Sequence, residues 1–233
     1  MANNFISYGK QWIDETDVQI VLKVLESDFL TQGPKVKEFE DAVASYVGAK
    51  YAVAVANGTA ALHLAYLAAG IKNGDEVITT PITFLASSNA ALYCDAEPIF
   101  SDIDSSTINI SPEEVSKKVT KRTKLIVPVH FGGNPCDMVQ LNKIGSKYNL
   151  AIIEDACHAL GAKYKVGNKW IMIGSCAHSD MTVFSFHPVK HITTGEGGMI
   201  TTNNKRYYEK LLTLRNHGMT RNPRMFKNKK MAF

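Results

Sequence analysis

The sequence predicts an α/β domain with a mostly parallel, seven-stranded sheet and helices on both faces of that sheet. Short runs rich in Val, Ile, Phe and Thr alternate with longer helical patterns, which is typical of successive β-α-β units. Runs such as Leu125-Ile126-Val127 and Ile152-Ile153 are continuously apolar, as expected for parallel strands buried on both faces. The 233-residue chain is 45% hydrophobic and 21% charged, a balance typical of globular proteins that excludes wholesale disorder, collagen and coiled coil.

Each predicted strand is a short apolar or β-branched run, and each predicted helix has an apolar face with helical spacing. The strands are expected at residues 51–56, 76–79, 98–102, 124–129, 151–154, 182–185 and 198–202. The helical faces lie within residues 36–46, 61–68, 141–148 and 207–214. The length suits one large domain or a tight pair.

Charge, cysteine content and hydropathy exclude several classes of function. The formal net charge is +4, and the basic clusters at residues 117–124 and in the last dozen residues are short, so they do not indicate nucleic-acid binding. Four cysteines without CxxC spacing are too few for a disulfide scaffold, which favours a reduced, cytoplasmic compartment. No secretory signal is evident in residues 1–12, and no apolar run approaches the ~20 residues of a membrane helix.

Ligand chemistry is expected where the strands end, because open α/β sheets bind ligands beyond the carboxyl ends of their strands. Lys190 follows one strand and stands between His187 and His191. Cationic neighbours and partial burial would both favour its neutral amine, the form that attacks a carbonyl carbon. A lysine taken alone is more often a solvated loop residue, so the surrounding segments have to decide between the two interpretations.

Asp155 follows the strand at residues 151–154 and has more than one interpretation. It could pair with the protonated ring nitrogen of pyridoxal, which needs such a partner to act as an electron sink, or it could cap a helical turn. A metal cluster is a weaker alternative, because adjacent residues on one turn seldom converge on one ion. That cluster would comprise Glu154, Asp155, Cys157 and His158.

Two further segments complete a candidate site. Asn57-Gly58-Thr59 joins a strand to a helix, so it predicts either a phosphate site at the helix N-terminus or an ordinary capped turn. Phe84 could stack on a flat ring or pack in the core. A phosphate cradle, a ring stacker, an acid and an amine all follow strands of one sheet, and together they predict a pyridoxal 5′-phosphate site.

At these residues the chain resembles the DegT/StrS-type sugar-nucleotide aminotransferases, which use pyridoxal phosphate on the large domain of the fold-type I scaffold. The segment around Lys190 is most similar to that of the transaminases of pseudaminic acid biosynthesis. The matching segments run in family order across nearly the whole chain, at residues 30–33, 57–62, 80–84, 154–161 and 184–198.

The resemblance implies a role for each matching residue. Lys190 would form the internal aldimine, Asp155 would hold the pyridinium nitrogen, and Phe84 would stack on the ring. His158 matches a family position near the ring. The phosphate-binding positions are matched by Gly58, Thr59, Ala60 and Ser185, and the sugar-nucleotide side by Tyr8, Asp28, Phe29, Leu30 and Thr31. The resemblance implies no metal site.

The implied reaction moves an amino group from L-glutamate to C4 of a UDP-linked 4-keto-6-deoxy-hexose, in a homodimer. Lys190 favours this reaction, because related dehydratases carry histidine at that position, whereas His191 departs from the proline common in close relatives.

The resemblance also divides the chain into parts. It implies an N-terminal substrate-side segment at residues 1–33, a core at 34–220 and a truncated tail at 221–233, without the small C-terminal domain of the family. There are two alternatives to the aminotransferase. One is a non-catalytic remnant or interaction module, and the other is a pyridoxal lyase on the same fold.

Overall fold

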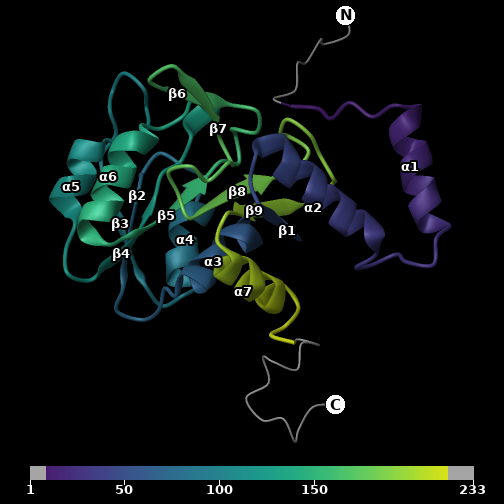
Figure 1. Cartoon of the computed structure of the whole chain (residues 1–233), viewed down its shortest axis with the longest axis horizontal. Coiled ribbons are helices and arrows are strands. Elements are labelled where there is room, and N and C mark those ends of the chain that lie inside the picture. Colours follow the sequence, from purple (N-terminus) through teal and green to yellow (C-terminus); the bar gives the residue numbers. More distant parts are fainter. Residues whose placement is uncertain (1–8, 220–233) are drawn as a thin grey trace, which may run out of the picture.

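The computed structural model describes residues 9–219, and its main sheet has seven strands (Figure 1). In chain order these are β1 (Tyr51–Val55), β2 (Glu76–Thr79), β3 (Glu97–Phe100), β4 (Thr123–Val127), β5 (Ala151–Asp155), β8 (Met181–Ser185) and β9 (Gly198–Thr202). They lie side by side in the order β1-β9-β8-β5-β4-β2-β3. Strand β9 pairs antiparallel with both β1 and β8, and the other pairings in this sheet are parallel, so the predicted strands and their mostly parallel arrangement are confirmed.

Helices cover both faces of the sheet, also as predicted. The described helices are α1 (Glu15–Leu25), α2 (Pro34–Val47), α3 (Gly58–Ala69), α4 (Ala86–Leu92), α5 (Pro112–Lys118), α6 (Met138–Tyr148) and α7 (Lys205–Arg215). Successive strand residues point to opposite faces, so Ile153 packs in one core cluster and Ile152 in another. Helices α3, α4 and α7 cover the first face, and α2, α5 and α6 contribute to the clusters on the second.

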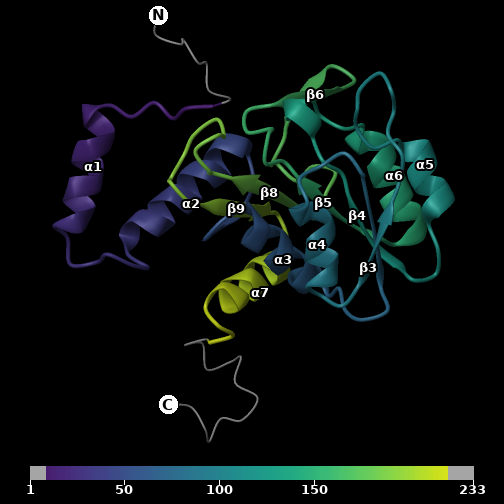
Figure 2. The same cartoon turned by 180° about the vertical axis from the view of Figure 1, so that it is seen from behind.

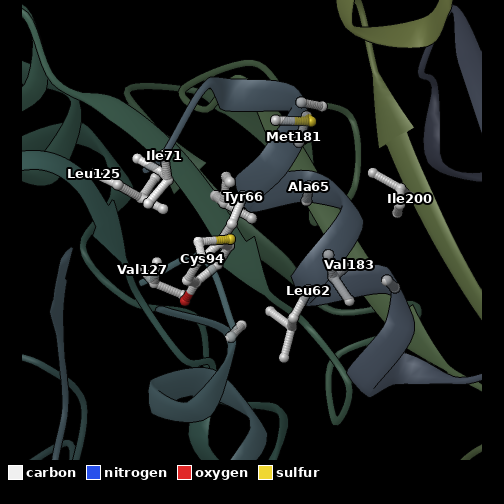
Figure 3. Packing of buried hydrophobic residues seen from close by; sticks show 14 of the residues in the cluster. Leu62, Ala65, Tyr66, Ile71, Cys94, Leu125, Val127, Met181, Val183 and Ile200 are labelled. Atoms are coloured by element: carbon white, nitrogen blue, oxygen red, sulfur yellow. The ribbon is translucent and has the colours of Figure 1, made fainter. Parts of the chain in front are cut away.

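The largest core cluster lies between α3 and the strands. Figure 3 shows Leu62, Ala65 and Tyr66 of α3 among side chains of the central strands, including Val183 and Ile200. All five side chains are at most 1% exposed. This packing fixes α3 against the middle of the sheet, so the N-terminus of α3 has a defined place beside the strand ends.

The structure adds elements that the sequence did not predict. Helices α1, α4 and α5 are new, and so is a separate antiparallel hairpin of β6 (Lys163–Val166) and β7 (Lys169–Met172). Helix α1 has no buried residue, and in both overall views it stands apart from the body of the domain (Figures 1 and 2). Within residues 9–219, no helix has both the length and the apolar character that crossing a membrane requires.

Two helices clamp the edge strand β1 at Ala54. Glu40 of α2 accepts a hydrogen bond from the Ala54 N–H at 2.9 Å, and Arg215 of α7 donates to the Ala54 carbonyl at 3.1 Å. The same Arg215 nitrogen also donates to the Glu40 carboxylate, which is nearly fully buried. Because an edge strand otherwise leaves such backbone groups unpaired, this clamp fixes the end of β1 just before the segment that begins α3.

Candidate active site

One cavity of about 760 Å³ opens at the carboxyl ends of β5 and β8. Residues from distant parts of the sequence line it together, as expected for an open α/β sheet. The residues predicted to bind the cofactor that line it are Gly58, Thr59, Phe84, Asp155, His158, Ser185 and Lys190. The structure therefore brings the predicted acid, amine, aromatic ring and helix start to one place.

Helix α3 begins at the cavity wall. Its N-cap residue, Asn57, accepts a hydrogen bond from the Ala60 N–H through Oδ1 at 2.8 Å. Ala60 does not line the cavity, and its N–H already has this partner. The N–H groups of Gly58 and Thr59 belong to the first turn, where no intrahelical acceptor is available, so they are the donors left for an anion at this end.

Gly58 is needed for the close approach of α3 to β8. A Cβ atom at this position would lie 3.1 Å from the Cβ of Ser185 and 3.2 Å from the Sγ of Cys157. Both distances are tighter than nine in ten real Cβ contacts, so a side chain here would require its neighbours or the helix start to shift by a few tenths of an ångström. The absence of a side chain thus brings a hydroxyl and the free N–H groups together.

Asp155 ends β5 and turns its carboxylate toward the cavity while remaining 5% exposed. Its Oδ2 accepts a hydrogen bond from the Ser87 hydroxyl at 2.7 Å, and its Oδ1 accepts one from the Cys157 N–H at 3.2 Å. Sequence reasoning assigned no role to Ser87, which comes from α4. The capping alternative for Asp155 therefore describes only one of its oxygens, and the other is held by a different helix.

Lys190 lies in the turn after β8, where its N–H donates to the His187 carbonyl at 2.9 Å. It is half-buried. Burial and, next, the nearby Lys190 ammonium lower the pKa of His158, although the Asp155 carboxylate opposes them. Burial and the Asp155 charge raise the pKa of the Cys157 thiol, which Lys190 opposes. The amine, the acid, the imidazole and the thiol thus share one electrostatic environment.

Glu154 belongs to a separate network behind the cavity wall. Its carboxylate accepts hydrogen bonds from His130 Nε2 and Thr182 Oγ1, both at 2.8 Å, and from Ser179. Because His130 Nδ1 accepts the Cys136 N–H at 3.0 Å, the ring carries its proton on Nε2. Burial acts to raise the pKa of Glu154, but these donors lower it overall.

The metal alternative is not supported by this placement. Successive strand residues alternate in direction, so Glu154 and Asp155 serve different surroundings. Among residues 9–219, no group of three or more His, Cys, Asp and Glu side chains is placed to hold a metal ion.

The predicted ring-stacking residue lines the cavity, whereas the described residues predicted for the substrate side do not. Phe84 lines the cavity with 75% of its surface exposed, so it is open to contact by a flat ring rather than packed in the core. The segment from Asp28 to Thr31 lies between α1 and α2, is exposed and does not line the cavity. Tyr8 lies outside the described residues. The substrate-side role of these positions stays a prediction.

The residues present fit pyridoxal 5′-phosphate. The start of α3 with Ser185 offers N–H and hydroxyl donors of the kind a phosphate needs, and a side chain at Gly58 would fill that cradle. Asp155 offers a fixed carboxylate for a ring nitrogen, and Lys190 offers an amine for an aldehyde. No other side-chain set lining this cavity combines these three functions.

Comparison with known proteins decides the family. Residues 11–233 match the model of the DegT/DnrJ/EryC1/StrS aminotransferase family. The chain belongs to this family. The family is one of aminotransferases, and its solved members include PLP and PMP forms, so the match confirms the predicted fold class and cofactor.

Named relatives refine this picture. The chain is 44% identical over 219 residues to the UDP-4-amino-4,6-dideoxy-N-acetyl-beta-L-altrosamine transaminase of Campylobacter jejuni, covering 93% of this chain and 56% of the relative. PseC of Helicobacter pylori, described as an aminotransferase of pseudaminic acid biosynthesis, superposes with a TM-score of 0.84 at 34% identity, over 93% of this chain and 57% of PseC.

A third relative was solved with the cofactor. Spr1654 of Streptococcus pneumoniae, described as a sugar aminotransferase, superposes in its PLP form with a TM-score of 0.83 at 31% identity. The match covers 92% of this chain and 59% of Spr1654. The chain thus spans a little over half the length of the relatives it matches.

Proposed function

We propose that this chain carries the cofactor-binding domain of an aminotransferase that moves an amino group from L-glutamate to C4 of a UDP-linked 4-keto-6-deoxy-hexose. The observation that carries the proposal is the convergence of Lys190, Asp155 and the start of α3 on one cavity. The named activities of the Campylobacter and Helicobacter relatives support the sugar class.

Different residues of the chain would bind different parts of the cofactor. When bound, pyridoxal phosphate supplies the aldehyde that takes up the amino group and the ring that delocalises the electrons of the broken Cα–H bond. Gly58, Thr59 and Ser185 would hold its phosphate, and Phe84 would lie against its ring. Asp155 would hold a proton on the ring nitrogen.

Lys190 would bond the cofactor in the resting state and act as acid and base during turnover. Once displaced by the amino donor, its free amine would take the Cα proton and deliver it to the carbon that had carried the aldehyde. The same amine would run these steps in reverse for the keto-sugar. One lysine thus serves two half-reactions in one cavity, so ping-pong kinetics are expected.

Borohydride reduction tests the attachment. The purified chain is incubated with pyridoxal phosphate, reduced, digested and mapped by mass spectrometry. The proposal expects the label on Lys190, with Lys190→Met unlabelled. Cofactor retained on another lysine, or no absorbance of a bound cofactor before reduction, would contradict it.

Turnover separates the alternatives. Amino transfer from L-glutamate to a UDP-4-keto-6-deoxy-sugar would dismiss both the non-catalytic remnant or interaction module and the pyridoxal lyase. Label on Lys190 without transfer, but with elimination or cleavage of an amino acid, would favour the lyase.

We also propose that the enzyme works as a homodimer in the cytoplasm. Exposed apolar side chains on α1, including Val21 at 57% and Leu25 at 60%, support an interface with a second copy. The cysteines Cys94, Cys136, Cys157 and Cys176 are free, which agrees with a reduced compartment. Size-exclusion chromatography with light scattering tests the dimer.

A further inference from the structure

Ser87 is a fully buried serine whose hydroxyl lies between the cavity loop and the acid of the site. It stands in the first turn of α4, directly after the loop that carries Phe84, and it is 0% exposed. Its Oγ lies 2.7 Å from Asp155 Oδ2, 2.8 Å from Thr83 Oγ1 and 3.4 Å from the Phe84 carbonyl. A buried hydroxyl with a carboxylate neighbour has little freedom to rotate.

Acceptor chemistry fixes the direction of these hydrogen bonds. An ionised carboxylate only accepts, and it is both nearer and more strongly attractive than the Phe84 carbonyl, so the Ser87 proton points to Asp155. Ser87 then has only lone pairs left for Thr83, so the Thr83 hydroxyl donates to Ser87. The result is a directed relay from Thr83 through Ser87 to Asp155.

The backbone of Ser87 is fixed as firmly as its side chain. Tyr66 of α3, itself 0% exposed, donates its hydroxyl to the Ser87 carbonyl at 2.6 Å. Helix α3 is the same helix whose start forms the phosphate cradle. The two helices that frame the cavity are therefore tied together at Ser87.

We propose that Ser87 is the positioning residue of Asp155, which it orients toward the cofactor's ring nitrogen. This inference rests on the proposed function, because the ring nitrogen belongs to pyridoxal phosphate. A carboxylate held in one orientation keeps its hydrogen bond with the N–H of the ring nitrogen, and this contact favours the protonated ring. Thr83 polarises Ser87 and strengthens the effect.

Ser88 offers a matched control. It is the next residue of α4, is 5% exposed, and donates its hydroxyl to the Leu85 carbonyl at 3.0 Å instead of to the site. Ser88→Ala therefore removes a buried hydroxyl from the same turn of the same helix without touching Asp155.

The experiment measures cofactor affinity and the ring-nitrogen resonance of ¹⁵N-labelled pyridoxal phosphate bound to the chain. Ser87→Ala should weaken affinity about tenfold, the scale of one lost hydrogen bond to a charged group, and should move the resonance toward that of neutral pyridine. Thr83→Val should move the resonance in the same direction by less. Ser88→Ala should change neither.

Each other outcome has a defined meaning. Ser87→Ala with wild-type affinity and resonance would overturn the inference, as would Ser88→Ala shifting both as far as Ser87→Ala. If Ser87→Ala does not fold by far-UV circular dichroism, the test passes to Thr83→Val, and an unchanged resonance there overturns the relay. Wild-type chain that binds no pyridoxal phosphate would overturn the proposed function first.

Discussion

The clamp on β1 can be tested by removing Arg215. Its guanidinium donates to the Glu40 carboxylate and to the Ala54 carbonyl, and the Glu40 side chain is 4% exposed. Arg215→Met leaves a buried carboxylate without its cation and a strand-edge carbonyl without its donor. Breaking a buried ion pair in this way typically costs about 3–5 kcal/mol.

The expected loss lies at the lower end of that range. The Arg215 side chain is 20% exposed, so water reaches part of the vacated site, and the Ala54 N–H at 2.9 Å still donates to Glu40. We expect Arg215→Met to lower the free energy of unfolding by about 3 kcal/mol. Urea unfolding followed by far-UV circular dichroism at neutral pH measures this.

A matched variant on the same helix isolates the buried carboxylate. Lys210 of α7 also donates to a backbone carbonyl, that of Ala68 at 2.9 Å, but no carboxylate lies in this contact. Lys210→Met should cost about 1 kcal/mol. Glu40→Gln combined with Arg215→Met should be more stable than the sum of the two single losses predicts, because no uncompensated charge remains.

The reasoning would be refuted by either of two results. One is Arg215→Met falling within about 0.5 kcal/mol of Lys210→Met, a gap too small for a stranded charge. The other is a strictly additive double variant. Because β1 leads into the start of α3, the same Arg215→Met chain should also bind pyridoxal phosphate more weakly.

Three further predictions concern the site and the network behind its wall. Gly198→Ala would place a Cβ atom 2.3 Å from the Asn57 carbonyl oxygen, so the start of α3 must move. The affinity for phosphate should then fall at least about tenfold, which titration with inorganic phosphate and with the cofactor measures. Lys190→Met should raise the pKa of His158 in the cofactor-free chain, yet leave it below 6.5 because burial is the larger cause; an NMR titration of the imidazole checks this. Because the pKa of Glu154 is lowered in the folded chain, its ionised carboxylate stabilises the fold at pH values above the pKa of the unfolded state, and this stabilisation is lost as the pH falls. Glu154→Gln should therefore flatten the loss of unfolding free energy below about pH 5.

Much of the sheet was predictable because its signal is local. A parallel strand buried on both faces must be apolar throughout, and Leu125-Ile126-Val127 shows this without any tertiary information. The hairpin of β6 and β7 had a weaker signal, namely polar–apolar alternation in Lys163–Val166 before the Gly167-Asn168 turn, which sequence reasoning could have used.

The missed helices had different causes. Val18, Val21, Leu22 and Leu25 have helical spacing, so the sequence contained the signal for α1, although none of these residues is buried in this chain. Helix α4 spans seven residues and its N-cap, Leu85, makes no side-chain hydrogen bond, so it has neither a long period nor a capping signal.

The site residues also divide into those with a local sequence signal and those that depend on tertiary packing. Asp155 and Lys190 could be found from the sequence because Asp155 ends one strand and Lys190 lies in the turn after another, and the topology of parallel sheets makes those positions meaningful. Ser87 could not, because its bond to Asp155 joins residues 68 positions apart and depends on how α4 packs. Partners that come from another element require the tertiary structure.

The antiparallel strand β9 explains how an edge strand can serve a central site. Gly58 follows β1 at the sheet edge, yet it lies against Ser185 at the end of β8, with β9 between them. Because β9 starts where its neighbours end, and starts at Gly198, the backbone of Asn57 can cross directly over its first residue. A parallel strand at this position would end in a loop that occupies the same space. The reversed direction of β9 and the missing side chain at Gly198 are therefore both required for α3 to bring its free N–H groups to Ser185, which is why a single methyl group there should weaken phosphate binding.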